Sequence, residues 1–167
     1  MMSHRPAIIH RELELKKSVI FLDANVVWKK DLLPYLDAEL KSTFENEDEI
    51  HVLAQDDENG GLCPGFMIYI SCPPTISFVE QWRAELDGKN SRNQVVFNKL
   101  LQLNPNFVAK ALPLKLFVNG GLYSKEYKMT DEERDLAVVV HNNYIAGYDE
   151  KLDRFKKWGL WALEDDN

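Results

Sequence analysis

The segment 19–28, Val-Ile-Phe-Leu-Asp-Ala-Asn-Val-Val-Trp, limits the possible folds more than any other part of the chain. Four apolar residues, β-branched and aromatic for the most part, run into Asp23 and Asn25 before apolar residues resume. Such a run is typical of a buried strand. Side chains alternate along an extended chain, so we expect Asp23 and Asn25 to point the same way at the end of that strand.

The strand end is also where chemistry is expected. In open α/β sheets, ligands lie in the crevice outside the carboxyl ends of the strands. A carboxylate and a carboxamide side by side there both offer oxygen, the ligand atom that hard cations prefer. Taken alone, the same residues also fit a buried strand that ends in an Asx turn.

Length and composition indicate one globular domain covering residues 1–167, because 167 residues with 45% hydrophobic content can bury a core. The net charge of −7 argues against nucleic acid or an anionic membrane as the main partner, because both would repel the chain. The acidic clusters 45–49, 56–58 and 164–166 are interpreted as solvated loops and a frayed tail.

Two cysteines, Cys63 and Cys72, are too few for a cysteine metal framework and form no Cys-x-x-Cys motif. No apolar run approaches the roughly 20 residues that span a bilayer. The amino-terminal residues also lack the apolar core of a signal peptide.

Helices and strands are expected to alternate, which predicts an α/β fold. Apolar spacing and Pro/Gly punctuation favour helices at 6–16, 74–88 and 149–157, and another from about residue 91. Strands are expected at 19–22, 65–71, 112–118 and 137–140, with an edge strand at 49–55. Only one helix precedes the strand that ends at Asp23, whereas a nucleotide-binding α/β fold normally begins with several βα units.

A second cluster of polar residues follows the expected strand 137–140, which delivers His141 to a strand end. An imidazole nitrogen there can complete an oxygen-rich site for Mn²⁺. Further along, Gly147 allows a close approach of backbone to ligand, and Lys151 supplies a positive charge for a diphosphate. In isolation the histidine also fits a satisfied core residue before a surface loop.

Three segments resemble the nucleotide-diphospho-sugar transferase family, close to glycosyltransferase family 77. Residues 21–28 are similar to its Asp-x-Asp motif followed by Val-Val-Trp, and residues 93–98 to its Asp-Gln-x-x-Phe-Asn. Residues 141–147, His-Asn-Asn-Tyr-Ile-Ala-Gly, resemble its His-x-Asn-Tyr-x-x-Gly. The segments occur in the family's order and span most of this chain.

The resemblance implies a GT-A-like mixed sheet flanked by helices, here without the N-terminal nucleotide-binding βα units. It also implies a metal-dependent, retaining glycosyltransferase. Such an enzyme moves a sugar from a nucleotide donor, expected to be UDP-linked, to a hydroxyl of a glycan or glycoprotein. Family members usually work in the Golgi lumen behind a membrane anchor.

Carried over residue by residue, the resemblance assigns a Mn²⁺ or Mg²⁺ ion to Asp23, Asn25 and His141. It assigns the diphosphate to Gly147 and Lys151, and a close approach of the sugar to Gly65. Gln94 would stabilise positive charge at the anomeric carbon, and Asn93 would contact a sugar. A polar first turn of a helix is the structural alternative for the last two.

Two departures from the family pattern matter together, because Asn25 and Asn93 each stand where the family has aspartate. The expected site therefore loses two negative charges. Unit charges ~4 Å apart interact by about 4 kcal/mol at an effective dielectric constant of ~20, so we expect weak metal binding without nucleotide. A catalytically degenerate binding or scaffold module is the competing hypothesis, together with an inactive fragment.

Overall fold

The computed structural model describes residues 4–38, 49–58, 60–87, 92–124 and 129–162. Its elements are α1 (His4–Glu14), β1 (Val19–Leu22), β2 (Val26–Trp28), β3 (Val52–Asp56), β4 (Leu62–Tyr69), α3 (Pro73–Leu86), α4 (Asn93–Leu103), β5 (Ala109–Leu112), β6 (Phe117–Asn119), α5 (Gly120–Tyr123), α6 (Asp131–Leu136), β7 (Val139–His141) and α7 (Tyr148–Lys157). Residues 33–38 form a further short helix. Helices and mixed sheets together confirm the predicted α/β class.

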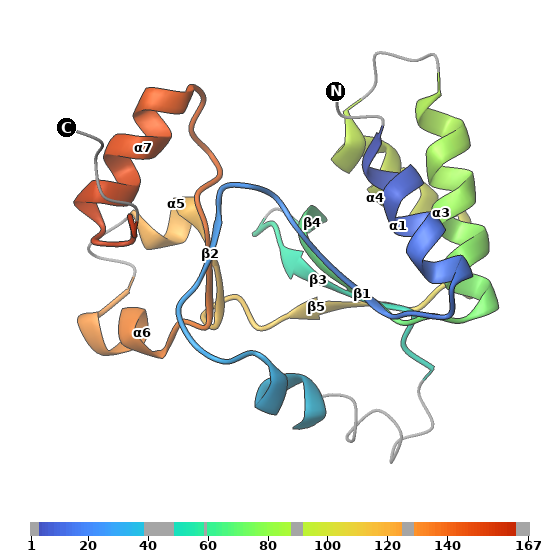
Figure 1. Ribbon diagram of the computed structural model, residues 1–167, viewed down its shortest axis with the longest axis horizontal. Helices are drawn as coiled ribbons and strands as arrows, with labels where there is room; N and C mark the ends of the chain where they lie inside the picture. Colours follow the sequence, from blue (N-terminus) through green and yellow to red (C-terminus); the bar gives the residue numbers. More distant parts are fainter. Residues whose placement is uncertain (1–3, 39–48, 59, 88–91, 125–128, 163–167) are drawn as a thin grey trace.

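The strands form two separate sheets (Figure 1). The larger has the order β1-β4-β3-β5, in which β5 runs parallel to β3 and the other pairs are antiparallel. The smaller has the order β2-β7-β6, with β2 antiparallel and β6 parallel to β7. The chain crosses between the sheets three times, after β1, after β2 and after β5. The short connections after β1 and after β5 therefore lie where the sheets meet.

Two apolar clusters pack around the larger sheet. The first joins α1, α3 and α4 to it and contains the fully buried Trp82. These three helices lie together in Figure 1. The second cluster joins β1, β3 and β4 to β6, β7 and the segment 32–36, and includes Phe66 and Phe117. A smaller cluster packs α5 against β6 and β7.

None of the described helices is long and apolar enough to cross a membrane.

The central strand β4 carries an irregularity that matters for the site. Its pairing with β3 shifts register between Ala54 and Gln55, so that Gln55 pairs with Cys63. The interruption accommodates Pro64, which has no N–H to donate to a neighbouring strand. On the other side, the Gly65 carbonyl accepts a hydrogen bond from the Asp23 N–H at 2.8 Å. The irregular part of β4 therefore sits beside the end of β1.

Three local predictions were wrong. The residues between Asp23 and Val26 are not extended: the Val26 N–H donates to the Asp23 carbonyl at 3.0 Å, and the chain turns into the second sheet. The expected edge strand 49–55 is interior, because β3 lies between β4 and β5. The expected single strand 112–118 is two strands in different sheets, because residue 113 is a proline and a turn follows it.

Candidate functional site

A pocket of about 450 Å³ lies at the junction of the two sheets. It brings together residues from all three segments that the sequence singles out. Of the predicted site residues, it is lined by Asp23, Asn25, Gly65, Asn93, Gln94, His141 and Lys151. Gly147 is not among its lining residues. The other residues of its wall include Arg5, Asp57, Cys63, Arg92, Asn143 and Tyr144.

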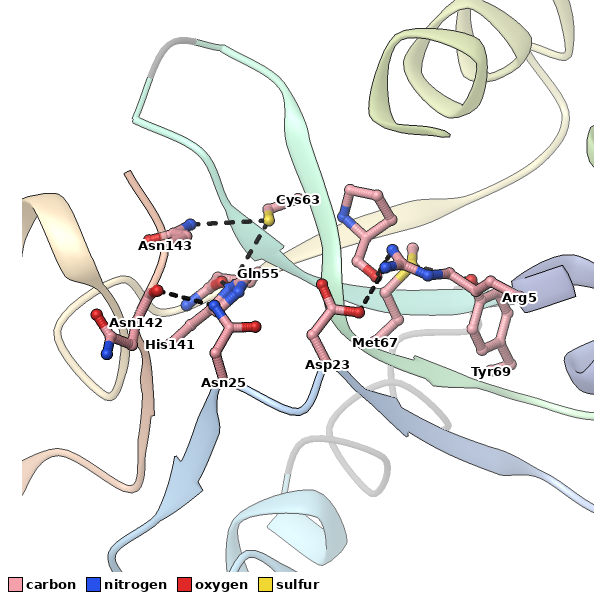
Figure 2. A network of polar contacts seen from close by, with 11 residues as sticks. Arg5, Asp23, Asn25, Gln55, Cys63, Met67, Tyr69, His141, Asn142 and Asn143 are labelled. Atoms are coloured by element: carbon pink, nitrogen blue, oxygen red, sulfur yellow. Dashed lines mark hydrogen bonds and ion pairs between the residues drawn. The ribbon is translucent and has the colours of Figure 1, made fainter. Parts of the chain in front are cut away.

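Asp23 already has a cationic partner in this pocket (Figure 2). Arg5, near the start of α1, donates from Nη2 to Asp23 Oδ1 at 2.5 Å. The same guanidinium donates to the Pro64 carbonyl at 2.7 Å and lies over the Phe21 ring. Burial raises the pKa of the Asp23 carboxyl, while the charge of Arg5 acts in the opposite direction. A cation that binds Asp23 must therefore share it with Arg5 or displace Arg5.

Asn25 is oriented by the backbone of the neighbouring strand. Its Nδ2 donates to the Asn142 carbonyl at 2.8 Å, and the Asn142 N–H donates to the Asn25 carbonyl at 2.8 Å. Figure 2 shows its side chain beside that of His141. Because the amide nitrogen is engaged, the side-chain oxygen is the atom left for a ligand. Asparagine suits this position because an aspartate would face the Asn142 carbonyl with oxygen.

His141, the last residue of β7, is held as a neutral imidazole. Its Nδ1 lies 2.8 Å from Gln55 Oε1, and Gln55 Nε2 donates to the Phe117 carbonyl at 3.1 Å. This chain of contacts makes Nδ1 the donor and leaves the lone pair on Nε2. Burial lowers the pKa of His141 to about 4, with Lys151, Arg5 and Arg154 acting in the same direction. A neutral histidine whose other nitrogen is anchored is the form that ligates metals.

The position of His141 is sufficient to require a glycine at residue 65. A Cβ at this position would lie 2.2 Å from His141 Cε1 and 2.9 Å from both ring nitrogens. The imidazole therefore occupies the volume that any side chain at residue 65 would need. Approach of a sugar to Gly65 stays a prediction.

Gln94 belongs to a network around Asp57, a residue that the sequence analysis placed in a solvated loop. Gln94 Nε2 donates to Asp57 Oδ2 at 2.6 Å, and the Tyr144 hydroxyl donates to the carboxylate and lies 2.9 Å from the Asp57 carbonyl. Burial raises the pKa of the Tyr144 hydroxyl, and the hydrogen bond to Asp57 and its charge act in the same direction. Asp57 thus holds Gln94 by its nitrogen and leaves the amide oxygen for a ligand. The buried Asn93 begins α4, and its carbonyl accepts from Trp82 Nε1 at 3.3 Å.

Helix α7 brings Lys151 to the pocket. Asn142 Nδ2 donates to the Lys151 carbonyl at 2.8 Å, which ties α7 to the end of β7. Gly147 is the N-cap of α7 and has φ of 92°, a conformation that favours glycine. A Cβ there would lie 1.7 Å from a Glu150 carboxylate oxygen. The local fold alone therefore accounts for Gly147, and its contact with a diphosphate stays a prediction.

The ligand atoms at this pocket are of kinds that bind a divalent cation, but together they carry only one negative charge. Asp23 offers one carboxylate, Asn25 an amide oxygen and His141 a ring nitrogen, a mixture of hard and borderline ligands that suits Mn²⁺. Three cationic side chains, Arg5, Arg92 and Lys151, line the same pocket. Such a surface attracts a diphosphate, which brings further oxygen ligands to the cation.

Another cluster with metal-ligand chemistry lies away from this pocket. Glu49, His51 and Cys72 place ligand atoms within 4.8 Å of one another, which is the one such group among the described residues. However, the Val108 N–H donates to His51 Nδ1 at 2.8 Å, so the neutral ring carries its proton on Nε2, the nitrogen that faces Glu49. Without a lone pair on Nε2, this histidine is a poor ligand.

Four residues that act on the predicted site residues were not expected from the sequence. Arg5, Asp57 and Tyr144 line the pocket, and Gln55 contacts His141 from outside its lining. Of these, Tyr144 had a signal, because the residue lies inside the motif around His141. Arg5 and Gln55 act across 18 and 86 residues of sequence, so no local pattern marks them.

Comparison with known proteins gives the family. A model of the nucleotide-diphospho-sugar transferase family matches residues 1–155. This chain belongs to that family. The match spans all the predicted site residues, from Asp23 to Lys151.

Named relatives of this nucleotide-diphospho-sugar transferase include glycosyltransferases with UDP-linked donors. It is 31% identical to UDP-D-xylose:L-fucose alpha-1,3-D-xylosyltransferase 1 of Arabidopsis thaliana, over 98% of this chain and 50% of the relative. It is 29% identical to UDP-galactose:fucoside alpha-3-galactosyltransferase of Dictyostelium discoideum, over 98% of this chain and 28% of the relative. It is 27% identical to beta-arabinofuranosyltransferase RAY1 of Arabidopsis thaliana, over 91% of this chain and 32% of the relative. The chain spans half or less of these relatives.

Proposed function

We propose that this protein transfers a sugar from a UDP-linked donor to a hydroxyl of a fucose-containing glycan or glycoprotein. The supporting observation is the single pocket lined by Asp23, Gln94, His141 and Lys151, residues that come from three distant segments. Family membership supports a nucleotide-sugar glycosyltransferase, and two of the relatives are named for fucose or fucoside acceptors. As the resemblance implied, the proposed compartment is the Golgi lumen, with a membrane anchor in the full-length form.

In the proposed mechanism, the cationic side of the pocket holds the diphosphate. Lys151 and Arg5 neutralise charge that accumulates on the leaving oxygen as the bond to the sugar breaks. On the other side, Asp57 fixes the nitrogen of Gln94, so that the amide oxygen faces the anomeric carbon and stabilises its developing positive charge. An amide is too weak a nucleophile to compete with the acceptor hydroxyl for that carbon. We propose retention of configuration, because an α-linked UDP-sugar gives the α-linked product for which the xylosyltransferase relative is named.

A divalent cation, Mn²⁺ or Mg²⁺, is proposed as the cofactor. Asp23, Asn25 and His141 would hold it, and it would supply Lewis-acid neutralisation of the diphosphate. With one carboxylate in the set, we propose that the nucleotide and the cation bind together rather than the cation alone.

The proposed activity is tested with protein expressed from its complete gene, incubated with UDP-xylose or UDP-galactose, Mn²⁺ and a methyl fucoside. We expect transfer to the fucoside, with the donor configuration retained by NMR. Replacement of Gln94 by alanine should lower kcat by about 10²-fold, because an electrostatic stabiliser of the transition state is lost.

The matched control is Gln81→Ala, at an exposed position of α3 outside the pocket, which should leave kcat unchanged. Absence of both UDP release and product, from protein with native circular dichroism, would refute the proposed transferase.

The cation proposal predicts an unusual response to Asn25→Asp. Without metal, the new carboxylate faces the Asn142 carbonyl in place of the present N–H donor, so unfolding should become easier by about 1–3 kcal/mol. Mn²⁺ with UDP should reverse that loss and bind at least tenfold more tightly than to the parent chain. Thermal denaturation and calorimetry measure both effects.

The control is Asn106→Asp, at an exposed position outside the pocket. It adds the same charge and should neither lower the stability without metal nor tighten the binding of Mn²⁺ with UDP. Equal Mn²⁺ affinity in the Asn25→Asp variant and the parent would contradict the assigned ligands.

A second candidate function is a degenerate transferase that binds nucleotide or glycan without turnover. Two observations favour it: the carboxylate of Asp23 is already paired with Arg5, and Asn25 adds no charge. If transfer appears only after both Asn25→Asp and Asn93→Asp, this binding-module function is correct.

A further inference from the structure

Tyr144 has a backbone conformation that few residues other than glycine adopt. Its φ is 57°, in the left-handed region, three residues after β7 ends. Such conformations cost free energy in a bulky residue and persist where the surrounding structure imposes them, often at functional sites. The residue is nevertheless 51% exposed, so burial of the ring does not explain the conformation.

The ring of Tyr144 is fixed at both ends although it is half exposed. Its hydroxyl is anchored on Asp57, the first residue of the loop between β3 and β4. Its base lies against the backbone of Gly121, where a Cβ would be 3.2 Å from Tyr144 Cδ2. A glycine at position 121 thus leaves room for the ring. The result is a rigid, exposed aromatic surface that lines the pocket.

The location of this ring indicates the part of a substrate that it meets. Asp57 accepts hydrogen bonds from both Tyr144 and Gln94, so the tyrosine adjoins the side chain proposed to face the transferred sugar. Two of the cation ligands proposed above, Asp23 and His141, make their contacts elsewhere, with Arg5 and Gln55. Tyr144 is therefore on the sugar side of the pocket, and its exposure places it toward the solvent from which an acceptor enters.

We propose that Tyr144 is the binding platform for the acceptor, with the apolar face and the C6 methyl group of a 6-deoxyhexoside packed on its ring. This inference rests on the transferase function proposed above and names the subsite that selects the acceptor. Aromatic rings provide large apolar contact areas with little conformational entropy to lose. A methyl group gains from such a surface, whereas a hydroxymethyl group in its place must give up water. The platform thus selects a fucoside over the corresponding galactoside.

The test compares Tyr144→Ala with the parent protein, using UDP-xylose or UDP-galactose as donor. Acceptors are methyl α-L-fucoside and methyl α-L-galactoside, which differ by one hydroxyl on C6. We expect the alanine variant to raise the KM for the fucoside at least tenfold and to lose most of the preference over the galactoside. The KM for the donor should stay within twofold, and the rate of donor hydrolysis should match that of Tyr144→Phe, which loses the same contact with Asp57.

Two further variants separate stacking from folding. Tyr144→Phe keeps the ring but loses the contact with Asp57, so its fucoside KM should lie between those of the parent and the alanine variant. Tyr148→Ala removes a 74% exposed tyrosine outside the pocket and should change no constant. Saturation-transfer NMR measures fucoside contact with aromatic protons directly, even in a variant with low turnover.

The outcomes are distinct. A fucoside KM that is unchanged in Tyr144→Ala, while donor hydrolysis persists, overturns the platform and leaves the transferase function standing. A rise in the donor KM instead of the acceptor KM also overturns it, because the ring would then serve the donor sugar. A parent protein that neither binds nor hydrolyses UDP-sugars refutes the proposed function itself.

Discussion

Replacement of Gly65 by alanine should destabilise the protein by about 1–3 kcal/mol, the range for overpacking a buried site, and should disrupt nucleotide binding. The new Cβ would lie 2.2 Å from His141 Cε1, far inside van der Waals contact. Neither side can yield easily, because the imidazole is buried and its Nδ1 is hydrogen-bonded to Gln55. Urea denaturation measures the loss of stability, and titration with UDP plus Mn²⁺ measures the loss of binding.

A double-mutant cycle separates this clash from a general intolerance of β4 to a side chain. In a His141→Ala background the imidazole is gone, so Gly65→Ala should then cost little. Gly61→Ala is the milder control, because its nearest neighbour is a side-chain oxygen of Asn98 at 3.2 Å. Equal costs of Gly65→Ala in both backgrounds would show that His141 is not the obstacle.

The sequence predicted the parts of the fold that depend on local pattern. Helices such as α3 were correct because proline and apolar spacing mark them. Helix α6 was missed although Thr130 and Glu133 form a capping box, a pattern that is readable in advance. By contrast, β5 and β6 join different sheets, and only tertiary pairing decides that.

For the site, local motifs pointed to residues that line the pocket. Contacts between distant parts of the sequence determine their ion pairing, tautomer and hydrogen bonds. Asp23 was expected as a metal ligand, and α1 supplies it with Arg5. His141 was expected at a strand end, but its tautomer depends on Gln55, in the interior of the other sheet. Asp57 lies in an acidic run that has the composition of a solvated loop, and only the fold brings Gln94 and Tyr144 to it. Charge and hydrogen-bond partners come from tertiary structure, so composition alone does not reveal them.

Acid should destabilise the protein through His141, and His141→Gln should reduce that sensitivity. Burial lowers the pKa of the folded-state imidazole to about 4 from an ordinary 6.5, so between these values the unfolded chain binds a proton that the folded chain does not. The contribution to stability is complete above pH 6.5 and is lost as the pH falls to about 4. It amounts to about 3 kcal/mol, the free-energy equivalent of that pKa difference. Urea denaturation at intervals from pH 8 to pH 4, without nucleotide or metal, measures it.

The informative quantity in that experiment is the pH dependence, because glutamine changes packing and thus the stability at every pH. Between pH 7 and pH 8, where the imidazole is neutral in both states, the two proteins should differ by a constant free energy of unfolding. Below pH 6.5 the difference should shrink, since the parent must exclude a proton that the variant does not bind. Glutamine can still donate an N–H to Gln55 Oε1, the acceptor that now faces His141 Nδ1, so the network stays satisfied. Parallel curves down to pH 4 would mean that the buried imidazole accepts a proton without loss of folding. The neutral tautomer proposed to ligate the cation would then no longer be imposed by the fold.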